Sequence, residues 1–228
     1  MNHPLDNPAW NALLSGNKNF SKGNEQIKYF DSEVAPFVGF ADYSPDKSDI
    51  LYHLISGQRT LAIISPKEII ISNQWDVIEH MKVLQMVHKH SALSEIAPAN
   101  CIQLKKQHVP EMIALTGMTH PGPFLKRTIE FGNYYGIFKD NKLVAMAGQR
   151  LHVNEYLEIS AVCTHPDYLG KGYASQLITD QIHRIKARAG IPFLHVKDDN
   201  NRAITLYKKL GFEARKQLDI YIIQKKIE

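Results

Sequence analysis

A glycine-rich turn between an apolar run and an amphipathic stretch is the part of the sequence best suited to bind an anion. Residues 159–164 are apolar and β-prone, and Gly170-Lys171-Gly172 follows a His-Pro-Asp turn. Residues 174–189 then place apolar side chains at helical spacing until Gly190. The first amides of a helix have no intrahelical partner and lie at its positive end. This order of strand, turn and helix predicts a phosphate site, with a plain tight turn as the alternative.

Two short motifs make the second half of the chain similar to the GNAT superfamily of N-acetyltransferases. The run from Val162 to Ala174 resembles that family's pyrophosphate loop, Gln/Arg-x-x-Gly-x-Gly/Ala. Here Gly172 and Ala174 match, and Leu169 replaces the Gln or Arg. The segment from Asn200 to Phe212 resembles the family's Asn-x-x-Ala-x-x-Leu-Tyr-x-x-x-Gly-Phe motif. The resemblance covers about residues 98–228 and implies a mixed α/β fold that uses an acyl-CoA.

The resemblance also implies which residues hold the acyl-CoA. In this family the fourth and fifth strands splay apart, and the pantetheine arm pairs with the open edge as an added strand would. The amides at the helix start hold the pyrophosphate. The implied binding residues are Val162, Cys163, Thr164, Gly170, Lys171, Gly172, Tyr173, Ala174, Ser175 and Asn200. We expect Asn200 to cap the following helix as well.

Two residues are the candidates for the acid and the base of acyl transfer. Tyr207 matches the position where many relatives use a tyrosine hydroxyl to protonate the coenzyme A thiolate, and simple packing is its alternative role. Glu158, near the start of the fourth strand, is the candidate base. Burial beside Leu157 and Ile159 is expected to raise its pKa, unless it is an exposed strand-edge carboxylate. His120, in a Pro-rich loop, could be a base, an acceptor contact or only part of that loop.

Charge and composition narrow the classes of partner. Residues 1–97 have a net charge of −3 and residues 98–228 one of +7, which suits a polyanion such as coenzyme A. We expect no nucleic-acid partner, because no nucleic-acid motif is present and no Lys/Arg cluster exceeds two or three residues. We expect no membrane partner, because no apolar run approaches the ~20 residues of a membrane span. No metal is expected either, since His88-Lys89-His90 lacks a third ligand nearby.

The chain divides into two predicted domains. Residues 98–228 carry both motifs and end in closing antiparallel strands over residues 212–225. Residues 1–97 mix helices and strands, including a strand at Glu68–Ser72, and hold no nucleotide or catalytic motif. We expect them to form a small α/β domain of unknown role, and a degenerate copy of the same fold is one option. Residues 91–100 are the candidate linker.

Together these features predict an acyl-CoA-dependent N-acyltransferase. It would move an acetyl group from acetyl-CoA to a primary amine of a small molecule or amino-acid-like acceptor by direct attack. The alternative is a non-catalytic acyl-CoA-binding regulatory module, which the Leu169 replacement favours. The two isolated cysteines, Cys101 and Cys163, fit reduced thiols in the cytoplasm. The oligomeric state is open, with a homodimer as one option.

Overall fold

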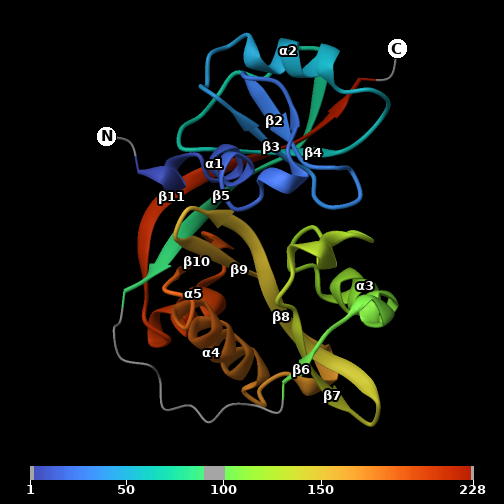
Figure 1. The fold of residues 1–228 in the computed structure, drawn as a ribbon, viewed down its shortest axis with the longest axis vertical. Coiled ribbons are helices and arrows are strands. Elements are labelled where there is room, and N and C mark those ends of the chain that lie inside the picture. Colours follow the sequence, from blue (N-terminus) through green and yellow to red (C-terminus); the bar gives the residue numbers. More distant parts are fainter. Residues whose placement is uncertain (1–2, 90–100, 227–228) are drawn as a thin grey trace.

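Eleven strands form one mixed sheet in the computed structural model, which describes residues 3–89 and 101–226 (Figure 1). The strand order is β1-β2-β3-β4-β11-β5-β10-β9-β8-β7-β6. This mixed sheet with its helices confirms the predicted α/β fold class. The predicted linker at residues 91–100 and His90 lie outside the described residues.

The strands differ greatly in length, and the two longest lie at the centre of the sheet. Those of the first half are β1 (Lys22–Gly23), β2 (Ile27–Tyr29), β3 (Phe37–Phe40), β4 (Leu61–Ser65) and β5 (Trp75–His88). Those of the second half are β6 (Ile102–Gln103), β7 (Tyr135–Lys139), β8 (Lys142–Val153), β9 (Tyr156–Thr164), β10 (Ile191–Lys197) and β11 (Phe212–Lys225).

Five α-helices in the described residues cover the sheet. They are α1 (Pro8–Leu14), α2 (Lys47–Leu54), α3 (Val109–Thr119), α4 (Tyr173–Lys186) and α5 (Asn201–Lys209). The apolar side chains of α4 and α5 pack with Met86, Ile159 and Leu194 on one face of the sheet. Helix α3 packs with Met146 and Cys163 in a separate core cluster. No helix within residues 3–89 and 101–226 combines the length and apolar character needed to cross a membrane.

The central pair of strands joins the two halves of the chain. β5 and β11 each have 14 residues and pair antiparallel from Phe212–His88 to Lys225–Trp75. β5 therefore lies between β11 and β10, although it belongs to the predicted N-terminal domain. Residues 212–225 are one continuous strand rather than the predicted closing strands, because their antiparallel partner comes from the first half. The boundary between separate domains near residue 97 stays a prediction.

The two halves repeat the same order of elements around this pair. In the first half the parallel strands β3 and β4 are joined through α2, and β2 lies antiparallel to β3. In the second half the parallel strands β9 and β10 are joined through α4, and β8 lies antiparallel to β9. This repetition supports the option that the first half is a degenerate copy of the second.

The predicted strand at Glu68–Ser72 is wrong. Its backbone finds partners outside a strand ladder, because Ile69 N donates to the Tyr221 hydroxyl at 3.2 Å and Ser72 N donates to Ser48 Oγ at 2.9 Å. Ile70 is 74% exposed, so the apolar character of this stretch does not mark a buried strand. The segment is instead the connection between β4 and β5.

The shared sheet predicts that residues 98–228 do not fold alone. Without β5, strands β10 and β11 lose the partner between them, and apolar residues such as Leu194 lose the packing of Met86. We expect a 98–228 fragment to lack a cooperative thermal transition in circular dichroism. A matched fragment that begins at residue 75 restores β5 and should regain β structure. A sharp, native-like transition in the shorter fragment would establish the domain boundary near residue 97 instead.

Candidate functional site

Strands β9 and β10 separate after a short stretch of pairing. Their parallel pairs run from Tyr156–Ile191 to Glu158–Phe193 and stop there. β10 continues along β5 as far as Lys197, while β9 continues along β8 as far as Thr164. The expected splay between the fourth and fifth strands of the second half is therefore confirmed, and it leaves one backbone edge of β9 without a strand partner.

A bulge redirects the open part of β9. Ala161 has φ +52°, and the register passes from Ser160–Gly148 directly to Cys163–Met146, so two residues of β9 face one of β8. Side chains four residues apart normally share a face of a strand. Here Ile159 packs under α4 and α5, whereas Cys163 packs in the cluster with α3. The bulge thus reverses the alternation just before residues 162–164.

The glycine turn places free amides at the start of α4. Gly170 and Gly172 have φ +77° and +76°, a conformation that side-chain-bearing residues rarely adopt. The first amide of this region with a helical bond is that of Gln176, which donates to Gly172 O at 3.1 Å. Within the described part of the chain, the amides of residues 173–175 have no hydrogen-bond partner. They form a positive site built from backbone groups.

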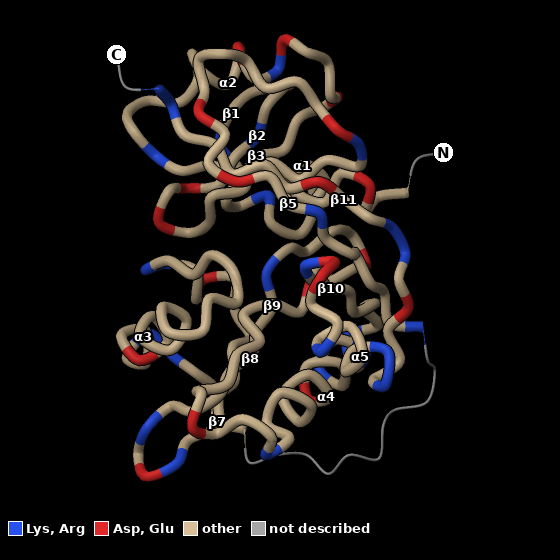
Figure 2. The backbone as a smooth tube through the Cα atoms, turned by 180° about the vertical axis from the view of Figure 1, so that it is seen from behind, with Lys and Arg blue, Asp and Glu red and all other residues tan. Residues whose placement is uncertain are grey.

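Basic side chains are few at this turn. Figure 2 shows Lys and Arg spread over both halves of the molecule, interspersed with Asp and Glu. Near the turn, the Lys171 ammonium lies 4.5 Å from the Tyr168 ring centroid, and Arg202 is the other cation beside it. Attraction of an anion here depends mainly on the helix start.

All of the predicted binding residues line one open cleft of about 690 Å³ between β9, the glycine turn and α5. They are Val162, Cys163, Thr164, Gly170, Lys171, Gly172, Tyr173, Ala174, Ser175 and Asn200. The cleft also includes Tyr207, together with Thr119, His120 and Pro121 from the end of α3. The structure thus brings the two sequence motifs together and adds the α3 end, for which the sequence offered only the His120 hypothesis.

Helix α5 contributes two polar groups to the cleft. Asn200 Oδ1 accepts the amide of Ala203 at 3.1 Å, so the predicted helix cap is confirmed. The ring of Tyr207 packs edge-on against Phe212, with centroids 6.1 Å apart. Burial raises the pKa of Tyr207 to about 12, so its phenol stays protonated at neutral pH and can donate. Packing and proton donation are compatible at this position.

Glu158 differs from its predicted state. Its carboxylate is fully buried, and the Arg150 guanidinium donates to it twice, at 2.9 and 2.6 Å. Nδ1 of His195 lies 2.7 Å from the same group. Burial alone would raise the pKa of Glu158, but the Arg150 charge and these hydrogen bonds hold it well below its usual range. The predicted rise is wrong. Glu158 is also absent from the residues that line the cleft.

Two other titratable residues at the α3 end of the cleft have different properties. Burial raises the pKa of the Cys163 thiol to about 11, which disfavours a nucleophilic thiolate. His120 ends α3 in a left-handed conformation, φ 47°, and lines both the main cleft and a hollow of about 320 Å³. Within the described residues, no group of three potential metal ligands is present.

Known proteins resemble this chain over its whole length and over its second half. The family model for FR47-like proteins matches residues 134–220. A solved structure assigned to the GNAT family of acetyltransferases, from Novosphingobium aromaticivorans, is 31% identical, with 99% of this chain and 100% of that chain covered and a TM-score of 0.92.

Shorter matches come from curated proteins. An acetyltransferase from Yersinia pestis is 42% identical over 53 residues, which are 22% of this chain and 37% of that protein. The N-alpha-acetyltransferase RimI of Mycobacterium tuberculosis is 32% identical over 85 residues, 36% of this chain and 52% of that protein. The chain thus spans about half or less of these two relatives. Because the Novosphingobium match extends over essentially the full length of both chains, this chain belongs to the GNAT family of acetyltransferases.

Proposed function

We propose that this protein transfers an acetyl group from acetyl-CoA to a primary amine. The observation that carries the proposal is the open edge of β9 beside the free amides at the start of α4, both in one cleft. The amides of residues 173–175 suit the pyrophosphate, and the edge at residues 162–164 suits the amide groups of the pantetheine arm. An edge amide can also polarise the thioester carbonyl.

Direct attack accounts for every atom of the reaction. The amine nitrogen gives up one proton to a base and bonds to the thioester carbonyl carbon, the carbon–sulfur bond breaks, and the departing thiolate takes a proton. We assign that proton to the phenol of Tyr207, which lines the cleft and is protonated at neutral pH. No covalent enzyme intermediate is needed, and the raised pKa of Cys163 supports this route.

We assign the base to His120 in place of Glu158. The Glu158 carboxylate is buried against Arg150 and is held as a weak base by its hydrogen bonds. Among the described side chains that line the cleft, His120 is the only imidazole, the side chain that most often serves as a general base. It lies at the α3 end of the cleft, whose lining also includes Cys163 and Thr164 of the β9 edge that the amine must approach.

The hollow on the other side of His120 suits the body of the acceptor. It is lined by Ile113, Thr116, Gly117, Gly122 and Phe124, none of which carries a charge. A small amine or amino-acid-like acceptor would place an uncharged part there. The resemblance to an N-alpha-acetyltransferase supports an α-amino group as the attacked amine. The unpaired thiols of Cys101 and Cys163 support a reducing compartment such as the cytoplasm, and a homodimer stays an open prediction.

One observation favours a second candidate, a regulatory module that binds acyl-CoA without turnover. Leu169 lines the cleft and is 50% exposed, where the family pattern has a Gln or Arg that could bind phosphate. The loss of that side chain weakens binding but leaves the backbone amides in place. Acetyl-dependent thiol release in the presence of amines separates this candidate from the enzyme.

The glycine turn predicts a loss of coenzyme A binding in Gly172→Glu. The added carboxylate repels the phosphates, so we expect at least a tenfold loss of affinity, about 1.4 kcal/mol, by calorimetric titration. Gly57→Glu is the matched control, because Gly57 also has a positive φ, +68°, with open space around it, but lies in the first half. Equal affinities in the two variants would remove the phosphate assignment.

The phenol of Tyr207 predicts a kinetic defect without a binding defect. Tyr207→Phe should lower kcat by roughly 10²-fold, because a general acid typically accelerates a reaction by about this factor. The coenzyme A affinity should stay unchanged. Because the Tyr207 pKa is about 12, the wild type should show no alkaline decline from this group below pH 10. Tyr168→Phe, which removes another phenol of the same cleft, is the control. Identical turnover in both variants would contradict the assignment.

The base assignment predicts a change in pH dependence. His120→Gln should lower kcat/KM for the amine by roughly 10²-fold at pH 7 and remove the acid limb that the histidine contributes. The defect should shrink at high pH, where the free amine is already deprotonated. His165→Gln is the control, since His165 follows β9 but does not line the cleft. If His120→Gln keeps both the wild-type rate at pH 7 and the wild-type pH profile, His120 is not the base.

A further inference from the structure

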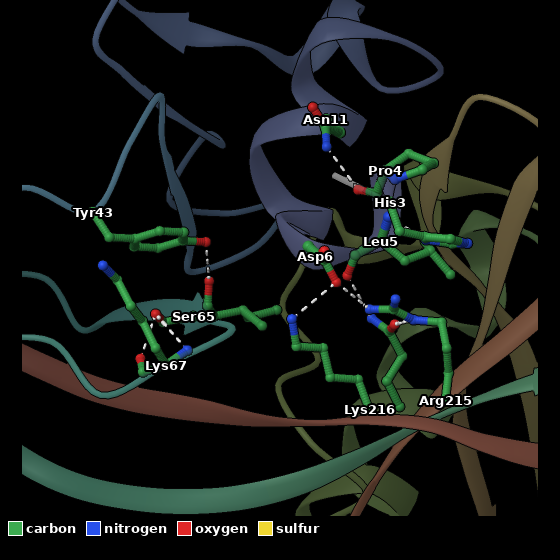
Figure 3. Close-up of polar contacts among 12 residues, drawn as sticks. His3, Pro4, Leu5, Asp6, Asn11, Tyr43, Ser65, Lys67, Arg215 and Lys216 are labelled. Carbon is green, nitrogen blue, oxygen red and sulfur yellow. Dashed lines mark hydrogen bonds and ion pairs between the residues drawn. The ribbon is translucent and has the colours of Figure 1, made fainter. Parts of the chain in front are cut away.

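A row of hydrogen-bonded polar side chains crosses five adjacent strands beneath the splay. It comprises Arg150 on β8, Glu158 on β9, His195 on β10, Gln85 on β5 and Arg215 on β11. The row ends at Asp6, whose carboxylate accepts from the Arg215 guanidinium at 2.7 Å and from Lys216 at 3.2 Å (Figure 3). The proposed chemistry uses none of these residues.

Glu158 occupies the point where β9 and β10 part. The Glu158–Phe193 pair is the last one between the two strands. His195 lies two residues beyond that pair on β10, and its Nδ1 is 2.7 Å from Glu158 Oε1. A side-chain hydrogen bond therefore joins the two strands where their backbone bonds stop. The Glu158 carboxylate also accepts the backbone amide of Leu151 at 3.3 Å and both bonds from Arg150, so it ties β8, β9 and β10 together.

The neighbours of His195 determine its proton arrangement. Arg215 Nε donates to Gln85 Oε1, which fixes the orientation of that amide. Gln85 Nε2 then donates to Leu5 O at 2.9 Å and faces His195 Nε2 at 3.0 Å. The Nε2 atom of His195 must accept, so its Nδ1 carries the proton and donates to Glu158. The charge of Glu158 is balanced by the Arg150 guanidinium.

We propose that Glu158 and His195 are positioning residues that set the opening between β9 and β10. The bond between them fixes the direction in which β9 leaves β10, and so where the edge at residues 162–164 presents the thioester to the amine. This inference rests on the proposed acetyl transfer. A positioning role is consistent with the burial of Glu158 and with its three hydrogen-bonding neighbours. The role of base is not. Arg150, Gln85 and Arg215 hold the pair in one orientation.

Conservative variants of His195 test the direction of its hydrogen bond. In His195→Asn the side-chain amide replaces Nδ1 at the same number of bonds from the backbone, whereas in His195→Gln it moves outward toward the Nε2 position. We expect His195→Asn to keep kcat/KM for acetyl-CoA within about threefold. We expect His195→Gln to lose roughly 10- to 100-fold, because small misplacements of reacting groups have effects of this size. If His195 only stabilises the fold, both variants should lose activity in proportion to their loss of stability, which thermal unfolding measures in parallel.

A second histidine provides the matched control. His80 Nε2 lies 2.8 Å from Asp219 Oδ1, also between neighbouring strands of the sheet, but away from the cleft. His80→Gln should leave the kinetics unchanged. Glu158→Gln keeps the shape of the side chain, so it should lower kcat/KM while the acid limb of the pH profile remains. Loss of that limb would restore Glu158 as the base and overturn the positioning role.

Measuring coenzyme A affinity tests the positioning role independently of whether the protein acetylates an amine. If the wild type acetylates no amine, the proposed function fails, but the opening of the splay still controls how the pantetheine arm binds. Direct titration with coenzyme A should then show His195→Gln about tenfold weaker than His195→Asn. Equal affinities and equal kinetics in these two variants, both folded, would overturn the inference.

Discussion

The site depends on the antiparallel pairing of β5 with β11, because this pairing places β5 beside β10. Because β10 is paired with β5 along Phe193–Lys197, it can leave β9 after Phe193 without losing a strand partner. Buried backbone groups in a sheet need hydrogen-bond partners. Without β5 beside it, β10 would lose all its backbone partners on leaving β9, and the separation would be unfavourable. The open edge of β9 is thus made possible by a strand from the other half of the chain. The first half takes part in forming the cleft even though none of its described residues, 3–89, lines it.

In the first half a side chain bridges the point that corresponds to the splay. β3 and β4 are also parallel and also separate after two pairs. There the hydroxyl of Tyr43 donates to the carbonyl of Ile64 at 2.8 Å, just beyond the last pair (Figure 3). The turn before α2 carries Asp42 and Asp46, both paired with the Lys47 ammonium at 3.5 and 3.6 Å, where the second half has glycines and Lys171. The two halves therefore repeat the same order of elements but differ in the side chains at the turn before the crossover helix.

Electrostatics beneath the splay shows how burial and pairing compete. Removing an ion from water costs several kcal/mol unless its partners compensate for the loss. For Glu158 the Arg150 guanidinium and the His195 imidazole outweigh that cost, and the pKa falls. For Tyr207 and Cys163 no charged partner compensates, and burial raises the pKa of each. Tyr207, the proposed acid, and Glu158 thus have pKa values shifted in opposite directions because their charged neighbours differ, although both are buried.

The sequence by itself determined the elements whose shape depends on near neighbours. The positive φ at Gly170 and Gly172 and the Asn200 cap are local conformations, and the two motifs were enough to predict the cleft that they line. Only the tertiary structure decided the partners of Glu158, the position of β5 and the arrival of His120 at the cleft. Arg150 and His195 lie eight and 37 residues from Glu158 in the chain, and the β5–β11 pairs join residues more than a hundred apart. Pairing and pKa depend on distances through space, which residue types and short spacings do not encode.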